Sequence, residues 1–220
     1  MLLAAATSAR SGDRVVDFGA GVGAAGLAVA KRVAGIELVL IEIDQALAAL
    51  ARANAAQNAI AADVIVLDVT SAAAFTAAGL APDSADVVLM NPPFNDAARH
   101  RASPDKARKI AHVAGAATLE SWIHAGRRIL KSGGVLTLIW RADGLVNVLA
   151  ALDRGFGSLA ILPVHGDAKN PAIRVLIRAI KGGKAPTEMH AALMLNESGV
   201  PNKQVQDVLA GKGVLPIAMR

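Results

Sequence analysis

Short apolar runs alternate with alanine-rich segments along the chain. Continuous apolar runs are typical of strands in a parallel sheet that helices cover on both faces, and alanine favours the helices between them. The pattern predicts strands at 14–20, 36–44, 63–70, 84–91 and 135–142, and helices at 24–35, 45–60, 119–134 and 145–157.

Two further strands are predicted near the end of the chain, at 159–166 and 172–180. Their connection is too short for a parallel crossover, so we expect an antiparallel hairpin at one edge. The pattern therefore predicts an α/β fold: a doubly wound, mostly parallel, seven-stranded sheet with an antiparallel C-terminal edge hairpin. We expect one domain over 1–220, with a core at about 10–182 and a C-terminal extension at about 183–220 that holds a helix around 201–211.

Composition narrows the class of protein. The 220 residues are 54% hydrophobic, which favours an ordered core, and none is cysteine, which excludes disulfides, thiolate metal sites and a cysteine nucleophile. No apolar run is long enough to span a membrane, and the first ten residues lack the basic start of a secretion signal. These observations favour a cytoplasmic protein.

Other kinds of site find no support in the sequence. His100, His112 and His124 are spaced too widely for helical metal-ligand pairs, so no metal site is expected. There is no phosphate-binding GK[ST] motif and no GxSxG nucleophile motif. Trp122 and Trp140 are interpreted as core residues.

The segment "DFGAGVGAAG" places Gly19, Gly21 and Gly23 where the first strand turns into a helix. Glycine lets the backbone approach a ligand closely, although a tight turn that needs glycine for packing is an alternative explanation. Gly21, Gly23 and Gly26 also match the dinucleotide pattern G-x-G-x-x-G. Asp17 favours another ligand, because a carboxylate here would repel a pyrophosphate and attract the ammonium group of S-adenosylmethionine.

Two further strands end in carboxylates. Glu42 can accept hydrogen bonds from ribose hydroxyls, since Asp44 is better placed to cap the following helix. This feature suits a nicotinamide cofactor and S-adenosylmethionine equally. Asp68 can accept from an adenine amine, with Val69 against the ring, although a plain turn residue explains Asp68 as well.

The fourth strand ends in "NPPF". Asn91 offers a side-chain carbonyl, Pro92 keeps its carbonyl without an N–H, and Pro93 forces Pro92 into an extended conformation. The result is a rigid turn with two adjacent acceptors, beside which Phe94 adds a flat ring. Two acceptors and a ring suit a planar amine, whose lone pair becomes more available when both hydrogens are bound. A proline-rich strand end without a function is the alternative.

A basic stretch follows this turn, and we expect it to face the phosphates of an RNA substrate whose target base is flipped into the site. A net charge of +5 agrees with such a partner, although a solvated basic surface explains the charge too. The candidate RNA-binding residues are Arg99, Arg101, Lys106, Arg108, Lys109 and His112.

The order and spacing of "DFGAGVGAAG", "EID" and "NPPF" resemble the class I S-adenosylmethionine-dependent methyltransferases that act on amino groups. With "SPDKARKIAH", "LESWIHAGRRILKSGG" and "PAIRVLIRAIKGG", the chain more narrowly resembles the bacterial family that methylates the exocyclic amine of adenine 37 in valine tRNA. The resemblance implies S-adenosylmethionine as cofactor, a tRNA or other RNA as partner, and catalytic residues Asn91, Pro92, Pro93 and Phe94. It implies cofactor-binding residues Asp17, Gly19, Ala20, Gly21, Gly23, Glu42, Ile43, Asp68 and Val69.

The resembled family carries a further segment before the helix that begins at "LLAAA", and that segment closes over the cofactor. We therefore expect either a longer protein or a more open pocket. The predicted function is methyl transfer to a planar amine, adenine N6 in tRNA first of all. The alternatives are a protein glutamine methyltransferase, a small-molecule methyltransferase, a nicotinamide-dependent oxidoreductase and a non-catalytic RNA-binding protein.

Overall fold

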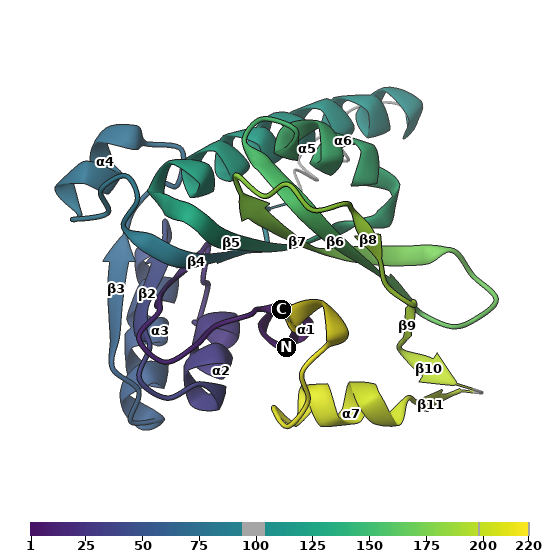
Figure 1. Ribbon diagram of the computed structural model, residues 1–220, viewed down its shortest axis with the longest axis horizontal. Coiled ribbons are helices and arrows are strands. Elements are labelled where there is room, and N and C mark those ends of the chain that lie inside the picture. Colours follow the sequence, from purple (N-terminus) through teal and green to yellow (C-terminus); the bar gives the residue numbers. More distant parts are fainter. Residues whose placement is uncertain (94–103, 198, 220) are drawn as a thin grey trace.

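The computed structural model describes residues 1–93, 104–197 and 199–219, with the backbone alone at 104–116, 197 and 201. One large sheet runs through the middle of the molecule (Figure 1). Its main strands are β1 (Arg14–Phe18), β2 (Glu37–Glu42), β3 (Ala62–Val66), β4 (Ala85–Met90), β5 (Leu130–Arg141), β6 (Phe156–His165) and β7 (Ala172–Lys181).

These seven strands lie in the order β3-β2-β1-β4-β5-β7-β6. β1 pairs in parallel with β2 and β4, and all its residues after Arg14 are buried. β7 pairs antiparallel with both β5 and β6. The predicted doubly wound sheet with an antiparallel C-terminal hairpin is therefore confirmed, and the carboxyl ends of β1 to β4 meet at one edge.

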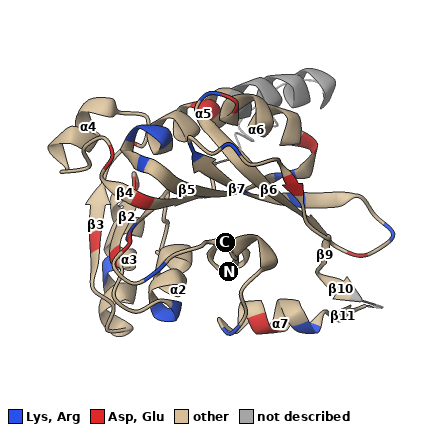
Figure 2. Cartoon of the chain, in the orientation of Figure 1, with Lys and Arg blue, Asp and Glu red and all other residues tan. Residues whose placement is uncertain are grey.

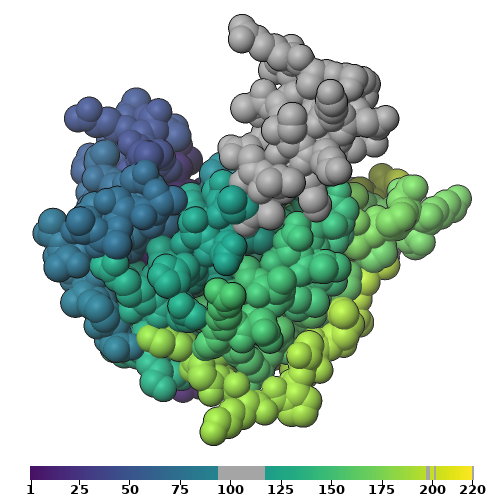
Figure 3. All heavy atoms as spheres, turned by 90° about the horizontal axis from the view of Figure 1, so that it is seen from above, coloured from purple at the N-terminus to yellow at the C-terminus, as the bar shows by residue number. Residues whose placement is uncertain are grey.

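Helices cover both faces of the sheet (Figure 1). One face carries α4 (Ala72–Ala77), α5 (Pro104–Ile129) and α6 (Leu145–Leu152), and Figure 3 looks onto it, with the blue α4 region beside the teal α5 region. The other face carries α1 (Leu2–Ala6), α2 (Ala24–Arg32), α3 (Gln45–Gln57) and α7 (Lys203–Leu209). Separate apolar clusters fill the two sides of the sheet.

The C-terminal extension packs against the first helix. The Leu215 N–H donates to the carbonyl of Ala5 at 2.9 Å, just before the 3-10 helix η3 (Pro216–Ala218). The buried Arg178 guanidinium donates to the carbonyls of Ile217 and Met219 at 3.1 and 2.8 Å. Both ends of the chain thus lie beside each other below the sheet (Figure 1).

Two short pairings extend the predicted architecture. The strands β8 (Glu188–Met189) and β9 (Leu193–Met194) add to β6. The strands β10 (Asn196–Glu197) and β11 (Val200–Pro201) form a separate pair. The predicted helix around 201–211 is present as α7, which Asn202 caps by accepting from the Gln204 N–H at 2.8 Å.

Several predicted boundaries were wrong. The helix expected at 119–134 begins at Pro104 and ends at Ile129, because the chain already pairs with β4 at Leu130. The register between β4 and β5 then shifts, because Ala85 pairs with Leu130 but Val87 pairs with Val135. The two glycines expected to end the helix lie in this irregular part of β5, and Gly133 has a φ of 76°. The helix expected at 145–157 ends at Leu152, ahead of Gly155 with a φ of 92°, and is preceded by the 3-10 helix η2 (Ala142–Gly144).

Charges are distributed over many elements of the described chain (Figure 2). Several basic side chains form ion pairs, among them Lys131 with Asp86 at 2.7 Å and Lys181 with Asp83 at 2.8 Å. Within the described residues, no helix is long and apolar enough to cross a membrane. Among these same residues, no group of three or more potential ligands is arranged to hold a metal ion.

Candidate functional site

A cavity of about 310 Å³ lies at the edge where the strands end. Its lining includes residues from the ends of β1, β2, β3 and β4, and one residue from α5. The cavity is at the lower end of the range of about 300–1,000 Å³ that is usual for small-molecule sites. The lining residues are Gly19, Ile41, Glu42, Ile43, Leu67, Asp68, Val69, Asn91, Pro93 and Trp122.

Glu42 joins the ends of the first two strands. Its Oε2 accepts from the Gly21 N–H at 2.8 Å, and its Oε1 accepts from the N–H groups of Ile43 and Asp44 at 2.8 and 2.9 Å. The side chain is buried and lines the cavity. Because a carboxylate has about four acceptor positions, these three bonds leave room for about one ligand hydroxyl.

The glycine-rich turn needs its glycines. Gly19, Gly21 and Gly23 have φ values of 65°, 58° and 85°, in the left-handed region that other residues rarely adopt. Gly26, the last glycine of the G-x-G-x-x-G match, serves packing, because a Cβ there would lie 2.5 Å from Leu40 Cδ2. The turn itself is held by the Ala20 N–H, which donates to the Ile41 carbonyl at 2.8 Å.

Asp17 lies beneath this turn and is not among the cavity-lining residues. It is 2% exposed, and its Oδ2 accepts from the Gly26 N–H at 2.8 Å. Burial raises the pKa of Asp17 to about 7; the hydrogen bond from Gly26 opposes the rise, and the negative charge of Glu42 adds to it. In this structure the carboxylate fixes the start of α2, and its contact with a cofactor ammonium group stays a prediction.

Asp44 and Asp68, at the ends of β2 and β3, bind nearby backbone groups. The expected helix cap at Asp44 is confirmed, because its Oδ1 accepts from the N–H groups of Ala46 and Leu47 at 2.8 and 3.0 Å. Asp68 Oδ1 accepts from the backbone and hydroxyl of Thr70, both at 2.8 Å. Asp68 therefore serves as a turn residue and lines the cavity as well.

The remaining predicted residues fall into two groups. Asn91 and Pro93 line the cavity, while Pro92 is buried beside them. Ala20, Gly21 and Gly23 belong to the turn and are not among the lining residues. Phe94, Arg99 and Arg101 lie outside the described residues, and the side chains of Lys106, Arg108, Lys109 and His112 on α5 are outside them too.

Sequence reasoning missed three lining residues: Ile41, Leu67 and Trp122. The prediction that Trp122 is a core residue is confirmed, because 9% of its surface is exposed and it packs in the core. Its role as a cavity wall depends on the position of α5 over the sheet. The sequence pattern gives no signal for that position.

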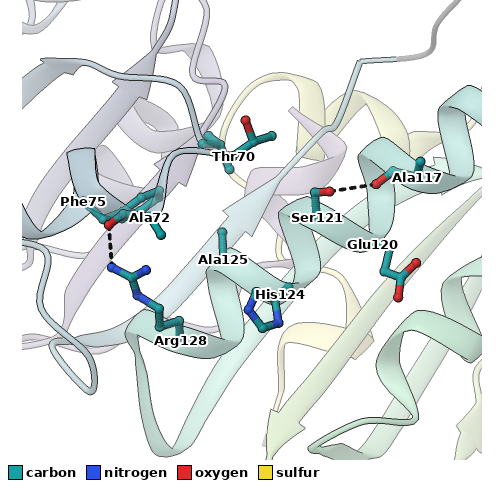
Figure 4. Close-up of a pocket in the computed structure, with 10 residues that line it drawn as sticks. Thr70, Ala72, Phe75, Ala117, Glu120, Ser121, His124, Ala125 and Arg128 are labelled. Carbon is teal, nitrogen blue, oxygen red and sulfur yellow. Dashed lines mark hydrogen bonds between the residues drawn. The ribbon is translucent and has the colours of Figure 1, made fainter.

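A second cavity of about 410 Å³ lies next to the first, between α4 and α5, and Val69 lines both (Figure 4). Two of its polar side chains already bind the protein itself. Arg128 donates to the Ala72 carbonyl at 2.7 Å, and the Ser121 hydroxyl donates to the Ala117 carbonyl at 3.0 Å. The first cavity, with its carboxylates and the Asn91 amide, is the better candidate for the site.

Known proteins resemble this chain in sequence and in fold. The family described as "Methyltransferase small domain" matches residues 1–166. The chain belongs to this family. A crystal structure of a predicted O-methyltransferase, Atu636 from Agrobacterium tumefaciens, is 33% identical, with 97% of this chain and 96% of that chain covered and a TM-score of 0.79.

A curated relative of this methyltransferase is the tRNA1(Val) (adenine(37)-N6)-methyltransferase of Bacteroides thetaiotaomicron, 30% identical over 152 residues. The match covers 65% of this chain and 58% of the relative, so the chain spans less than two thirds of that protein's length. A class I S-adenosylmethionine-dependent methyltransferase structure from Listeria monocytogenes, 16% identical with a TM-score of 0.59, shares the fold over 94% of this chain and 65% of that one.

The cofactor of this methyltransferase is S-adenosylmethionine, as predicted, and not a nicotinamide. The cavity fits that group. Glu42 would accept from a ribose hydroxyl, Asp68 would accept from an adenine amine, and Ile43, Val69 and Trp122 would supply apolar walls.

Replacing Glu42 by Gln should weaken binding of the product S-adenosylhomocysteine. The amide keeps the size of the side chain but loses acceptors for the ribose and for the Gly21 N–H. We expect a loss of about 1–3 kcal/mol in binding free energy by calorimetry. Asp44→Asn is the matched control, since it removes a charge two residues away and keeps a good cap. Parental affinity in the Glu42 variant would contradict the ribose assignment.

Replacing Asp17 by Asn should remove one pH-dependent part of the stability. In the unfolded chain Asp17 loses its proton near pH 4, about its ordinary pKa, whereas the folded protein keeps the proton up to about pH 7. Its contribution is therefore fully present below about pH 4 and is lost as the pH rises through about 7. The free energy of unfolding of the parent, minus that of the variant, should fall over this interval in urea titrations. The exposed Asp63→Asn variant is the control, and a constant difference for Asp17→Asn would refute the prediction.

Proposed function

We propose that this methyltransferase acts on a planar exocyclic amine and that its substrate is adenine N6 in a tRNA. The observation that carries the proposal is the shared cavity: Asn91 and Pro93 line the same space as Glu42 and Asp68. The residues proposed to bind the amine therefore lie beside the residues proposed to bind the cofactor. The named activity of the Bacteroides relative supports the same substrate class.

The Asn91–Pro92 turn would hold the amine. When bound, S-adenosylmethionine supplies a methyl group on a positively charged sulfur. The side-chain carbonyl of Asn91 and the backbone carbonyl of Pro92 accept from the two amine hydrogens, which favours a pyramidal nitrogen with an available lone pair. The proton can leave to solvent after transfer, so the site needs no strong base. The rigid backbone fixes the direction of attack.

The Agrobacterium relative is named as a predicted O-methyltransferase, which makes a hydroxyl acceptor the second candidate. A hydroxyl has one hydrogen, whereas the turn offers two adjacent acceptors. The turn thus suits an amine better than a hydroxyl. A protein glutamine amide also has two hydrogens, and the basic stretch after the turn is what favours RNA over it.

That basic stretch contributes much of the net charge. Residues 94–116 contain five basic and two acidic residues, so this segment holds +3 of the formal +5. We propose that Arg99, Arg101, Lys106, Arg108, Lys109 and His112 contact RNA phosphates. The order of the chain supports this, because the stretch directly follows the proposed amine-binding turn.

The acceptor can be identified directly. Purified protein with labelled S-adenosylmethionine is offered a tRNA pool from a strain that lacks the enzyme, a glutamine-containing protein pool, and a set of small phenols. Label in tRNA that nucleoside analysis identifies as N6-methyladenosine supports the proposal. Label in the protein pool or the phenols alone would assign the glutamine or hydroxyl acceptor instead.

Replacing Asn91 by Ala should lower turnover on the order of 100-fold or more and leave the affinity for S-adenosylhomocysteine near the parental value. The lost hydrogen bond is strongest in the transition state, so rate suffers more than binding. Single-turnover kinetics and calorimetry measure the two effects. Asn91→Asp keeps an acceptor oxygen and should retain more activity than the alanine variant. Parental turnover in Asn91→Ala would refute the amine-binding role.

Reversing the charges of Arg99 and Arg101 to Glu should lower tRNA affinity and flatten its dependence on salt, since fewer counterions are released. Affinity for S-adenosylhomocysteine should not change. Arg10 and Lys31, reversed together, are the matched control, because they are exposed at the opposite edge of the sheet. Equal salt slopes for the parent and the Arg99/Arg101 variant would remove this stretch from the RNA surface.

A further inference from the structure

Trp122 is wedged between the glycine-rich turn and the aromatic core. Its indole makes an edge contact with Phe18, with ring centroids 6.4 Å apart and an interplanar angle of 80°. Phe18 in turn contacts Phe75 of α4 at 5.5 Å and 62°. On its other side, the indole occupies the space where a side chain on Gly19 would lie, because a Cβ there would come within 2.5 Å of Trp122 Cη2.

This contact distinguishes two glycines of one turn. Gly19 and Gly21 both have a left-handed φ, so a side chain at either position would strain the backbone. Only Gly19 faces the indole, since a Cβ on Gly21 would meet nothing within 4 Å. Gly19 is therefore needed both for its backbone conformation and for the space that Trp122 fills.

The helix that carries Trp122 is fixed on both sides. Arg128 ties α5 to α4 through the Ala72 carbonyl, as Figure 4 shows, and Arg127 donates to the Arg154 carbonyl at 2.6 Å. Trp122 keeps 9% of its surface exposed and is among the residues that line the cofactor cavity. The indole is thus a rigid, flat, apolar surface at that cavity.

We propose that Trp122 is a cofactor-binding and positioning residue: its indole is the wall against which the adenosyl group packs, and it sets the position of Gly19. Ile43 and Val69 complete the apolar lining. Aromatic rings can stack on any nucleobase, so the indole suits an adenine-containing ligand. The inference rests on the cofactor and does not depend on which acceptor is methylated.

Fluorescence tests this directly, because the protein has two tryptophans and no tyrosine. In Trp140→Phe, where Trp122 is the only tryptophan, S-adenosylhomocysteine should change the emission in a saturable way with the midpoint found by calorimetry. In Trp122→Phe the remaining Trp140 should not respond, since it is 4% exposed, packs against Gly144 and does not line the cavity. No change in the Trp140→Phe protein would overturn the proposed contact.

Affinity provides the second measurement. Trp122→Leu should weaken S-adenosylhomocysteine binding about tenfold, and Trp122→Phe should weaken it less because a ring remains. Melting curves without ligand show whether each variant is folded. Affinity within about twofold of the parent in a folded Trp122→Leu protein would make Trp122 a core residue only. The fluorescence result decides the question if that variant does not fold.

The positioning role has its own readout. Gly19→Ala should melt at a lower temperature than Gly21→Ala, because both share the backbone strain and only Gly19→Ala clashes with the indole. In the Trp122→Leu background this difference should shrink, as expected for two residues in contact. An unchanged difference would show that Trp122 does not set the position of Gly19. All three measurements omit the methyl acceptor, so they are independent of the substrate assigned above.

Discussion

The site depends on the hydrogen bonds that the Glu42 carboxylate accepts. One oxygen binds the Gly21 N–H in the turn after β1, and the other binds two N–H groups at the start of the connection to α3. Two strand ends are thereby joined through one buried group. Three N–H donors compensate its charge, which makes the burial of a carboxylate tolerable at this edge. Glu42 also lines the cavity, so this bond network forms part of the cavity wall.

The sheet order turns separate pieces of sequence into one site. β1 lies between β2 and β4, so the glycine-rich turn, Glu42 and Asn91 come to neighbouring strand ends although they are far apart in the chain. The antiparallel hairpin of β6 and β7 adds to the far side of β5. Arg178 of β7 binds the C-terminal segment, so the extension is anchored below the sheet, on the face with α1.

Much of this arrangement could be predicted from the sequence, because it follows from local signals. Continuous apolar runs mark the strands, and a polar residue at a strand end, such as Asp44, marks a cap. The missed features depend on packing. The helix α4 consists mainly of alanine and shows no apolar period, and Trp122 reaches the cavity only because α5 crosses the sheet at that point. The contact between Asp17 and the Gly26 N–H depends likewise on how closely α2 approaches β1.

The two buried carboxylates explain why a dinucleotide motif here serves a different ligand. In a dinucleotide site, free N–H groups of the glycine turn and the helix start bind the pyrophosphate. In this protein Glu42 takes the Gly21 N–H, and Asp17 takes the Gly26 N–H in the first turn of α2. Two of the donors that could bind an anion are therefore used, and the Glu42 carboxylate places a negative charge beside the turn. Such a turn attracts a cationic ligand. S-adenosylmethionine, with its ammonium group and positively charged sulfur, meets that condition, and a nicotinamide dinucleotide does not.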